Sequence, residues 1–258
     1  MSQATDPAEE ERRHGAGAGA TGTAAASATA ETSTGADILP YVVPMFAYLG
    51  LTALEGYLPQ LLNIQSTALY PVAYAAKLVI VSLLVWHYRA TWNDFKPRPK
   101  TVATILGILT GLFTCALWVG LDGLYPTFAF LGGSRSAFDP FTLSAFARWA
   151  FIAVRLLGLV VLVPMFEELF WRSFLMRWVI DNEFVRVPVG KVTPIAAAVT
   201  SALFALAHPE WLPALLTGAL WAWLLWWTES LSACLISHAT ANLALGIYVI
   251  VTHDWKFW

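Results

Sequence analysis

Charged residues are scarce in this sequence. Lys, Arg, Asp and Glu make up 12% of its 258 residues, whereas hydrophobic residues make up 58%. A soluble domain normally carries about 25% charged residues, so this composition excludes a soluble globular protein. The formal net charge is −2, and no basic stripe points to a nucleic-acid partner. The remaining class is a helical membrane protein, because backbone polar groups in lipid need hydrogen-bond partners within their own segment.

Cysteine is also nearly absent, since Cys115 and Cys234 are the only two. Both lie in apolar runs, so the sequence contains neither a disulfide framework nor metal-ligand spacing. We expect both to be small buried residues. Tryptophan, by contrast, is frequent. Many of the 13 stand near the ends of apolar segments, where aromatic side chains anchor proteins at the membrane interface.

Residues 1–36 form a polar stretch of Ala, Gly, Thr and Ser. This composition buries too little apolar surface to offset the entropy of ordering, so it predicts a disordered leader. Arg12 and Arg13 are followed by Gly, Ala and Thr rather than by an apolar core, which argues against a twin-arginine signal. The membrane domain is then expected to be residues 37–258.

Apolar segments long enough to cross a bilayer recur from Ile38 onward. They predict an all-α polytopic membrane bundle of about 7–8 transmembrane or membrane-embedded helices. The segments lie near residues 38–58, 69–88, 101–121, 143–178, 193–208, 212–228 and 231–252.

The connection 87–100 predicts the orientation of the bundle. Its basic residues are Arg89, Lys96, Arg98 and Lys100. The connection 122–141 has a single arginine, Arg135. By the positive-inside rule the connection 87–100 faces the cytoplasm, and the leader lies on the same side. We therefore expect a multi-pass protein with a cytoplasmic N-terminus.

The run 143–178 is too long for one straight span. Thirty-six helical residues would reach about 54 Å, whereas a hydrocarbon core is about 30 Å thick. The sequence therefore predicts a break, at Gly158 or at Pro164, because proline removes a backbone hydrogen bond and starts helices readily. Alternatively, residues 143–155 lie along the interface and one span covers about 156–178.

Two adjacent carboxylates stand inside this run, in the stretch Pro-Met-Phe-Glu-Glu-Leu-Phe-Trp-Arg at 164–172. A carboxylate at membrane depth costs roughly 2.5–3.5 kcal/mol, so the pair indicates a function. Glu168 and Arg172 share a helix face, which favours an ion pair that holds two helices together. Glu167 points about 100° away, and its own segment has no basic residue at helical spacing. Such a carboxylate suits a general base.

Polar residues on two later segments are candidate partners for Glu167. Phe204 and His208 are spaced i, i+4, and so are His238 and Asn242. This set fits water activation, with Glu167 as base and His208 binding or orienting the water. The imidazole of His238 and the carboxamide of Asn242 would then donate to a developing oxyanion.

Three other functions stay open at this point. A zinc site could use Glu167, His208 and His238, although no His-Glu-x-x-His motif places two ligands on one helix face. A non-catalytic scaffold or immunity-type binding protein would keep the fold without the chemistry. A small transporter would use Glu167 and Glu168 as a proton relay, although the sequence has no recognisable internal repeat.

Four other charged residues lie within or near the apolar segments. Lys77 is expected to face the bundle interior or to reach toward the interface, and Glu55 is expected at the interface. Arg148 and Arg155 share a helix face and are expected to meet carboxylates or lipid phosphates. For Arg155, the two central glutamates are alternative partners.

The three motifs together resemble those of a known family. Glu167-Glu168-x-x-x-Arg172, Phe204-x-x-x-His208 and His238-x-x-x-Asn242, in this order within residues 143–252, are similar to the motifs of the CPBP intramembrane proteases, which include the type II CAAX prenyl endopeptidases. The resemblance implies a glutamate-dependent endopeptidase without metal or other cofactor. It implies catalytic roles for Glu167, His208, His238 and Asn242, and supporting roles for Glu168, Arg172 and Phe204.

Longer stretches, at 167–178, 208–211 and 246–249, resemble a narrower bacterial branch that is associated with exosortase and PEP-CTERM sorting systems. This resemblance implies a bacterial inner membrane, a membrane-associated protein or peptide as substrate, and a link to such a sorting system. Prenylated CAAX substrates are not expected in bacteria.

The depths of the two histidines predict the form of the site. His208 stands at the far end of its segment, whereas His238 is near the middle of its own. Pro209 disfavours continuation of the first segment. The motifs can therefore converge only in a wide, water-accessible cavity that opens to one side of the membrane.

Overall fold

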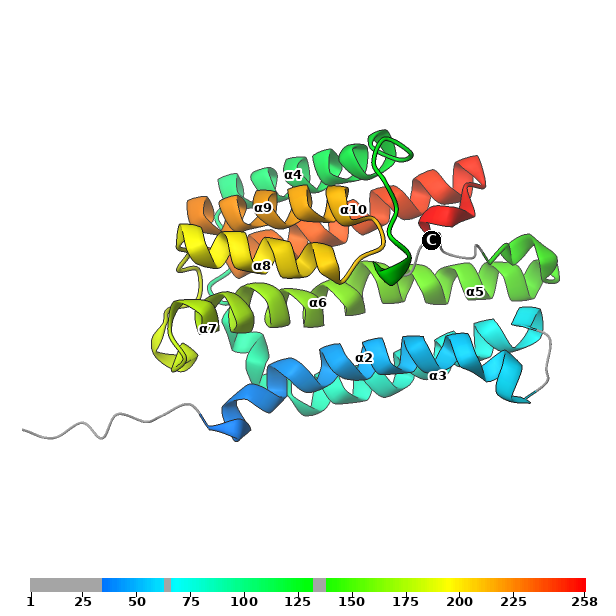
Figure 1. Ribbon diagram of the computed structural model, residues 1–258, viewed down its shortest axis with the longest axis horizontal. Coiled ribbons are helices and arrows are strands. Elements are labelled where there is room, and N and C mark those ends of the chain that lie inside the picture. The colour runs from blue at the N-terminus through cyan, green and yellow to red at the C-terminus, as the bar shows by residue number, and fades with distance from the viewer. Residues whose placement is uncertain (1–33, 63–65, 132–137) are drawn as a thin grey trace, which may run out of the picture. The chain divides into compact units, whose positions relative to one another are not determined.

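The computed structural model describes residues 34–62, 66–131 and 138–258, so almost all of the predicted leader lies outside the described residues. Within these ranges the chain is helical and contains no strand (Figure 1). The α-helices are α2 (Gly35–Leu62), α3 (Ser66–His87), α4 (Thr101–Gly120), α5 (Ala145–Leu157), α6 (Val163–Glu168), α7 (Met176–Ile180), α8 (Pro194–Leu206), α9 (Trp211–Thr228) and α10 (Leu231–Thr252).

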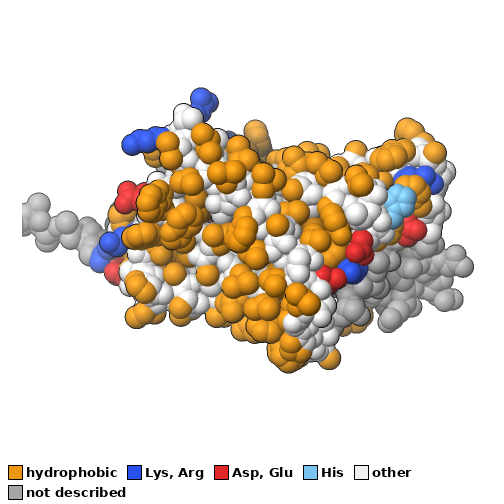
Figure 2. All heavy atoms as spheres, turned by 90° about the horizontal axis from the view of Figure 1, so that it is seen from above, with side chains coloured by type: hydrophobic (Ala, Val, Ile, Leu, Met, Phe, Trp, Pro, Cys, Tyr) orange, Lys and Arg blue, Asp and Glu red, His pale blue; other side chains and the backbone are white. Residues whose placement is uncertain are grey.

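The predicted all-α membrane bundle is confirmed. Among the described residues, five helical runs are long and apolar enough to cross a membrane: Gly35–Tyr57, Leu69–His87, Thr101–Gly120, Ala145–Ile180 and Leu231–Thr252. Large hydrophobic side chains lie exposed along these runs. Figure 2 shows hydrophobic side chains over most of one face, with charged side chains mainly toward its two ends. This distribution suits a lipid-facing surface.

The ends of several helices follow from local sequence. The side chain of Thr193 accepts a hydrogen bond from the Ala196 N–H, and Pro194 occupies the first turn of α8. Ser230 caps α10 in the same way, through the Ala233 N–H. Side-chain caps and an early proline satisfy or remove N–H groups that have no partner within the helix.

The helices form a hairpin and a larger group (Figure 1). The hairpin is α2 with α3, and it packs against the long α5–α6–α7 run. On the other side of this run, α10 packs closely along α4, and α8 pairs with α9. Within the larger group, α10 also contacts α6, so the third motif is brought to the first.

The helices α4 and α10 approach each other closely. A Cβ built on Gly107 would lie 2.8 Å from the Ala233 carbonyl oxygen, and one on Gly111 would lie 2.8 Å from the Thr240 Cβ. Small residues spaced four apart let membrane helices approach closely, and the Gly107–Gly111 pair has this spacing. The approach places α10, and with it the third motif, against α4.

The prediction that the run 143–178 breaks is wrong. Residues Ala145–Ile180 form one continuous helical run of 36 residues. Two π-helical segments, η4 (Gly158–Leu162) and η5 (Leu169–Leu175), replace the break and keep the backbone hydrogen-bonded. The excess length lies in α5, whose first turns expose Phe146 and Trp149. Neither an interfacial helix before residue 155 nor a new helix beginning after a gap at Pro164 is present.

Candidate active site

A cavity of about 630 Å³ lies among α2, α3, α4, the α5–α6 run, α8 and α10. Its lining includes every residue predicted to be catalytic, namely Glu167, His208, His238 and Asn242, together with Phe204. Residues of all three motifs therefore line one space. The catalytic roles of these residues stay predictions.

The two adjacent glutamates lie in different environments. Glu167 lines the cavity with a side chain that is largely buried, at 9% exposure. Glu168 is fully buried and accepts a hydrogen bond from the Arg172 guanidinium at 3.2 Å. The predicted Glu168–Arg172 ion pair is confirmed. Because successive helical residues differ by about 100° in direction, one carboxylate faces the cavity while the other faces the bundle interior.

Glu168 also joins the first motif to the third. Its Oε1 lies 2.9 Å from the His238 Nδ1, in addition to its contact with Arg172. The Arg172 guanidinium lies over the rings of Phe204 and Trp221, at 4.7 and 4.8 Å from their centroids. Removing one member of such a buried network leaves the other charges uncompensated, so we expect the network to act as a unit.

The contact with Glu168 fixes the orientation of the His238 ring. A carboxylate only accepts hydrogen bonds, so Nδ1 carries the proton and Nε2 is the ring atom left for the cavity. The neutral imidazole then presents an acceptor at Nε2, and the imidazolium presents a donor. The predicted oxyanion role therefore requires the imidazolium, with Glu168 as its counter-ion. The ring packs on Trp221, with centroids 4.4 Å apart.

His208 is held by the end of its own helix. α8 ends at Leu206, and Pro209 prevents continuation. The His208 Nδ1 lies 2.7 Å from the Phe204 carbonyl oxygen, which can only accept, so Nδ1 donates and Nε2 carries the lone pair. Its ring also contacts Phe204 and Trp118, at 4.4 and 5.9 Å between centroids. A fixed imidazole with an accepting Nε2 suits the orientation and deprotonation of water.

Asn242 has a structural contact that the sequence did not predict. Its Nδ2 donates to the Leu159 carbonyl oxygen at 2.7 Å. In the π-helical segment the Val163 N–H bonds the Gly158 carbonyl, five residues back. The next donor in that ladder belongs to residue 164, which is a proline and has none. Asn242 thus satisfies the carbonyl that Pro164 leaves without a donor, and its second N–H is the one that could serve an oxyanion.

Two charged residues near the site make contacts that the sequence did not predict. Arg155 donates a hydrogen bond to the Tyr70 hydroxyl, and its guanidinium lies over the Tyr74 ring. Glu55, near the end of its predicted span, is buried, and it forms an ion pair with Lys77 at 2.5 Å. Lys77 faces the interior, which is one of its two predicted positions.

Glu55, Lys77 and Arg155 all line the cavity, and the sequence reasoning did not assign them to the site. A lysine in an apolar segment implies a buried counter-ion, and Glu55 is the carboxylate of the preceding segment. This signal could have revealed the pair. Cys115 also lines the cavity and is only partly buried, whereas Cys234 is fully buried as predicted.

The chain's last segment borders the same cavity. Phe257 and Trp258 are among its lining residues. Lys256 bonds Asp122 at 2.5 Å and Asp254 at 3.3 Å, which ties this segment to the end of α4. The hydrogen bond to Asp122, with a smaller effect of Asp254, raises the pKa of the Lys256 ammonium.

The zinc alternative has no support in the donor geometry. Across the described part of the chain, no three His, Cys, Asp or Glu side chains are grouped so that they could hold a metal ion. Glu167, His208 and His238 share the cavity without forming such a group.

Comparison with known proteins agrees with the resemblance noted from the motifs. Residues 149–244 match the model of the family described as type II CAAX prenyl endopeptidase Rce1-like. No curated protein and no solved structure matches the chain. The matched residues include all three motifs, from Glu167 to Asn242. Through this segment, the chain is similar to the type II CAAX prenyl endopeptidases of the Rce1-like family.

Proposed function

We propose that this protein is an intramembrane endopeptidase that hydrolyses a peptide bond of a membrane-associated protein or peptide. The observation that carries the proposal is the convergence of Glu167, His208, His238 and Asn242 on one cavity of about 630 Å³. These residues come from α6, α10 and the end of α8, and no packing requirement demands that so many polar groups meet at membrane depth.

In the proposed reaction, Glu167 and His208 position one water, and one of them takes its proton as the oxygen attacks the scissile carbonyl. The carbonyl oxygen becomes an oxyanion in a tetrahedral intermediate. The His238 imidazolium and the second N–H of Asn242 donate to this oxyanion. Collapse of the intermediate breaks the C–N bond, and the proton taken from water passes to the leaving amine.

The surroundings of these four residues favour such chemistry. The Glu168–Arg172–His238 network holds the oxyanion donor in place, and the carbonyl of Phe204 holds His208. Preorganised donors in a low-dielectric site stabilise developing charge more strongly than donors in water. The reaction needs no metal, because the donors and the base are all side chains.

We place the protein in the inner membrane of a bacterium, with its N-terminus in the cytoplasm. The basic connection after α3 supports this orientation. The proposed link to an exosortase and PEP-CTERM sorting system rests on the sequence resemblance alone.

The test is Glu167→Gln, with Glu229→Gln as the matched control, because Glu229 is exposed at the end of α9. The purified protein is placed in lipid vesicles with a library of palmitoylated, internally quenched peptides, and the products are identified by mass spectrometry. We expect Glu167→Gln and His208→Ala to lower the cleavage rate by about 10²–10⁴-fold, the usual contribution of a general base. We expect Glu229→Gln to keep the full rate.

Three results would contradict the proposal. Cleavage that survives Glu167→Gln unchanged would remove the assigned base. Loss of cleavage on addition of a chelator, with recovery on addition of zinc, would show metal-dependent chemistry instead. A wild-type protein that cleaves no peptide, and whose cellular phenotype is unaffected by Glu167→Gln, would favour the scaffold alternative.

A further inference from the structure

We infer that the cavity opens to the extracytoplasmic side of the membrane, so that the substrate is a segment of a membrane-anchored protein that has already crossed the bilayer. The statement about the substrate rests on the proposed function, whereas the sidedness of the cavity does not depend on it. Three observations carry the inference: the position of the cavity along the helices, the packing at the opposite end, and the distribution of basic residues.

The two ends of the bundle are defined by their connections. The cavity end holds residues 121–131 and 138–144, the connection 207–210 and the segment 253–258, toward the right of Figure 1. The basic end holds the connections 88–100, 181–193 and 229–230, at the left. Each long helix runs from one end to the other, so the position of a residue in its helix shows which end it is nearer to.

The cavity extends from the cavity end to slightly beyond the middle of the bundle, where Glu167 and His238 line it. Its lining residues run from Met45 to Gly56 on α2, from Leu69 to Lys77 on α3 and from Thr114 to Trp118 on α4. Those on α10 begin at His238 and continue toward its C-terminus. Residues of the connections at the cavity end, including Pro209 and Glu210, also line it. Among the described residues, none of the connections at the basic end contributes to the lining.

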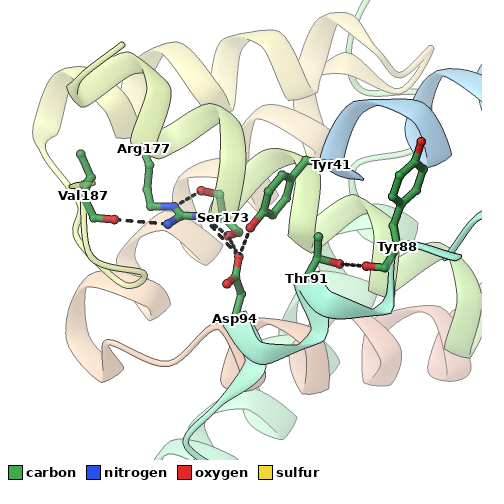
Figure 3. Close-up of polar contacts among 7 residues, drawn as sticks. All are labelled: Tyr41, Tyr88, Thr91, Asp94, Ser173, Arg177 and Val187. Atoms are coloured by element: carbon green, nitrogen blue, oxygen red, sulfur yellow. Dashed lines mark hydrogen bonds and ion pairs between the residues drawn. The ribbon is translucent and has the colours of Figure 1, made fainter. Parts of the chain in front are cut away.

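Packed side chains lie between Glu167 and the basic end of the bundle. The buried Glu168–Arg172–His238 network comes first, and the aromatic side chains of Phe170 and Phe174 follow along the same helix. A polar cluster then joins three elements around Asp94, which accepts hydrogen bonds from Tyr41 at 2.8 Å, Ser173 at 2.5 Å and Arg177 at 3.2 Å (Figure 3). These contacts tie η1 (Arg89–Phe95) to α2 and to the helical run that contains Glu167, so the described residues pack together on this side of the site.

Basic residues identify the basic end as cytoplasmic. The connections at this end and the last turn of α7 contain Arg89, Lys96, Arg98, Lys100, Arg177, Arg186 and Lys191. The connections at the cavity end and the first turn of α5 contain Arg135, Arg148 and Lys256. Short cytoplasmic connections carry the excess of Lys and Arg in polytopic membrane proteins. The basic end therefore faces the cytoplasm, and the cavity end faces away from it.

The depth of the site limits the substrate further. Arg155 lies beside Trp258 of the segment at the cavity end, and Glu167 stands twelve residues further along the same helical run. This spacing corresponds to about 18 Å. An extended chain spans about 3.3–3.6 Å per residue, so a substrate must insert about five unfolded residues to reach Glu167. A translocated segment beside a membrane anchor meets this requirement, whereas a cytoplasmic chain end cannot reach the opening.

The native cysteines test the sidedness without any substitution in the site. Cys115 lines the cavity, and Cys234 has no exposed surface. Right-side-out and inside-out membrane vesicles are treated with the impermeant cation 2-(trimethylammonio)ethyl methanethiosulfonate, and the remaining thiols are counted by a gel shift with a large maleimide. We expect labelling of Cys115 in right-side-out vesicles to be about tenfold faster or more, because a sealed bilayer excludes a permanent charge.

Three variants control this measurement. Cys115→Ala should abolish the labelling. Asn93→Cys in the Cys115→Ala background places a thiol on the exposed surface of η1, and it should react only in inside-out vesicles. Ala207→Cys in the same background is a second reporter, because Ala207 is exposed and lines the cavity.

Three results would each overturn the inference. Cys115 and the Ala207→Cys variant could label faster from the cytoplasmic side, they could label equally from both sides, or both could fail to label from the outer side. Labelling does not depend on catalysis. If the Glu167→Gln protein labels from the outer side as the wild type does while both proteins cleave peptides equally, the sidedness stands and the proposed reaction fails.

Discussion

The close approach of α4 to α10 gives a prediction in which one methyl group decides the outcome. Gly111 has no space for a Cβ, which would overlap the Ser237 carbonyl oxygen and lie 2.8 Å from the Thr240 Cβ. Gly50, on α2, has nothing within 4 Å of the same position. Gly111→Ala and Gly50→Ala are therefore the same chemical change in opposite steric settings.

The expected magnitudes follow from two effects. Alanine is favoured over glycine in a helix by about 1 kcal/mol, and both variants gain this. Overpacking costs about 1–3 kcal/mol, and for Gly111→Ala we expect the upper part of this range, because one of the blocking atoms belongs to the backbone and cannot turn away. Gly111→Ala should therefore lower the free energy of unfolding by about 2 kcal/mol, while Gly50→Ala raises it by about 1 kcal/mol.

The assay is reversible unfolding in mixed micelles with increasing sodium dodecyl sulfate, followed by tryptophan fluorescence and circular dichroism. Cleavage of the peptide library is measured in parallel. His238 directly follows Ser237, so separating the two helices moves the oxyanion donor, and a displacement near 1 Å lowers the rate by about 10²-fold. Equal stability of the two variants would show that this approach does not hold α10 in place.

Two further predictions concern the buried polar contacts. Glu168→Gln should lower the free energy of unfolding by about 3–5 kcal/mol, because it leaves Arg172 buried without its counter-ion. The double variant with Arg172→Met should recover much of this loss. A Glu168→Gln protein as stable as the wild type would refute the role of the network. Asn242→Ala should lower the free energy of unfolding by about 1–3 kcal/mol, because it leaves the Leu159 carbonyl without a donor. Adding Pro164→Ala should restore this stability by supplying a backbone N–H, without restoring cleavage. Absence of this rescue in the unfolding assay would show that the proline is not the reason for the contact.

The helices themselves could be predicted closely from the sequence. The apolar run 231–252 is α10 residue for residue, and the run 101–121 is α4 to within one residue. This accuracy has a physical cause, because a lipid-facing helix must be apolar along its length and its ends coincide with polar connections. The prediction that Lys77 faces the interior or the interface could not be narrowed, since the spacing within one helix does not show what the next helix presents.

The site was predictable only in part, because the spacing within one helix does not show which residues of other helices it contacts. Helical spacing placed Glu168 with Arg172, and it separated Glu167 from both. The contact of Glu168 with His238 joins residues 70 positions apart, and no periodicity within a segment contains that information. The motif resemblance indicated that these residues belong together, but it did not show that His238 would be bonded to the supporting glutamate rather than placed free in the cavity.

The helical run that was predicted to break at Gly158 or Pro164 is instead continuous, and it aligns four residues along one cavity. Arg155, Leu159, Val163 and Glu167 all line the cavity, at intervals of four residues. In an ideal α-helix, twelve residues at about 100° each would leave Arg155 and Glu167 about 120° apart, on different faces. The π-helical segment at Gly158–Leu162 accommodates about one extra residue, which removes about 100° of this difference. A break would have achieved the same alignment only by exposing backbone groups to lipid. The π-helical segment keeps these groups hydrogen-bonded, and Asn242 donates to the Leu159 carbonyl, for which Pro164 has no N–H.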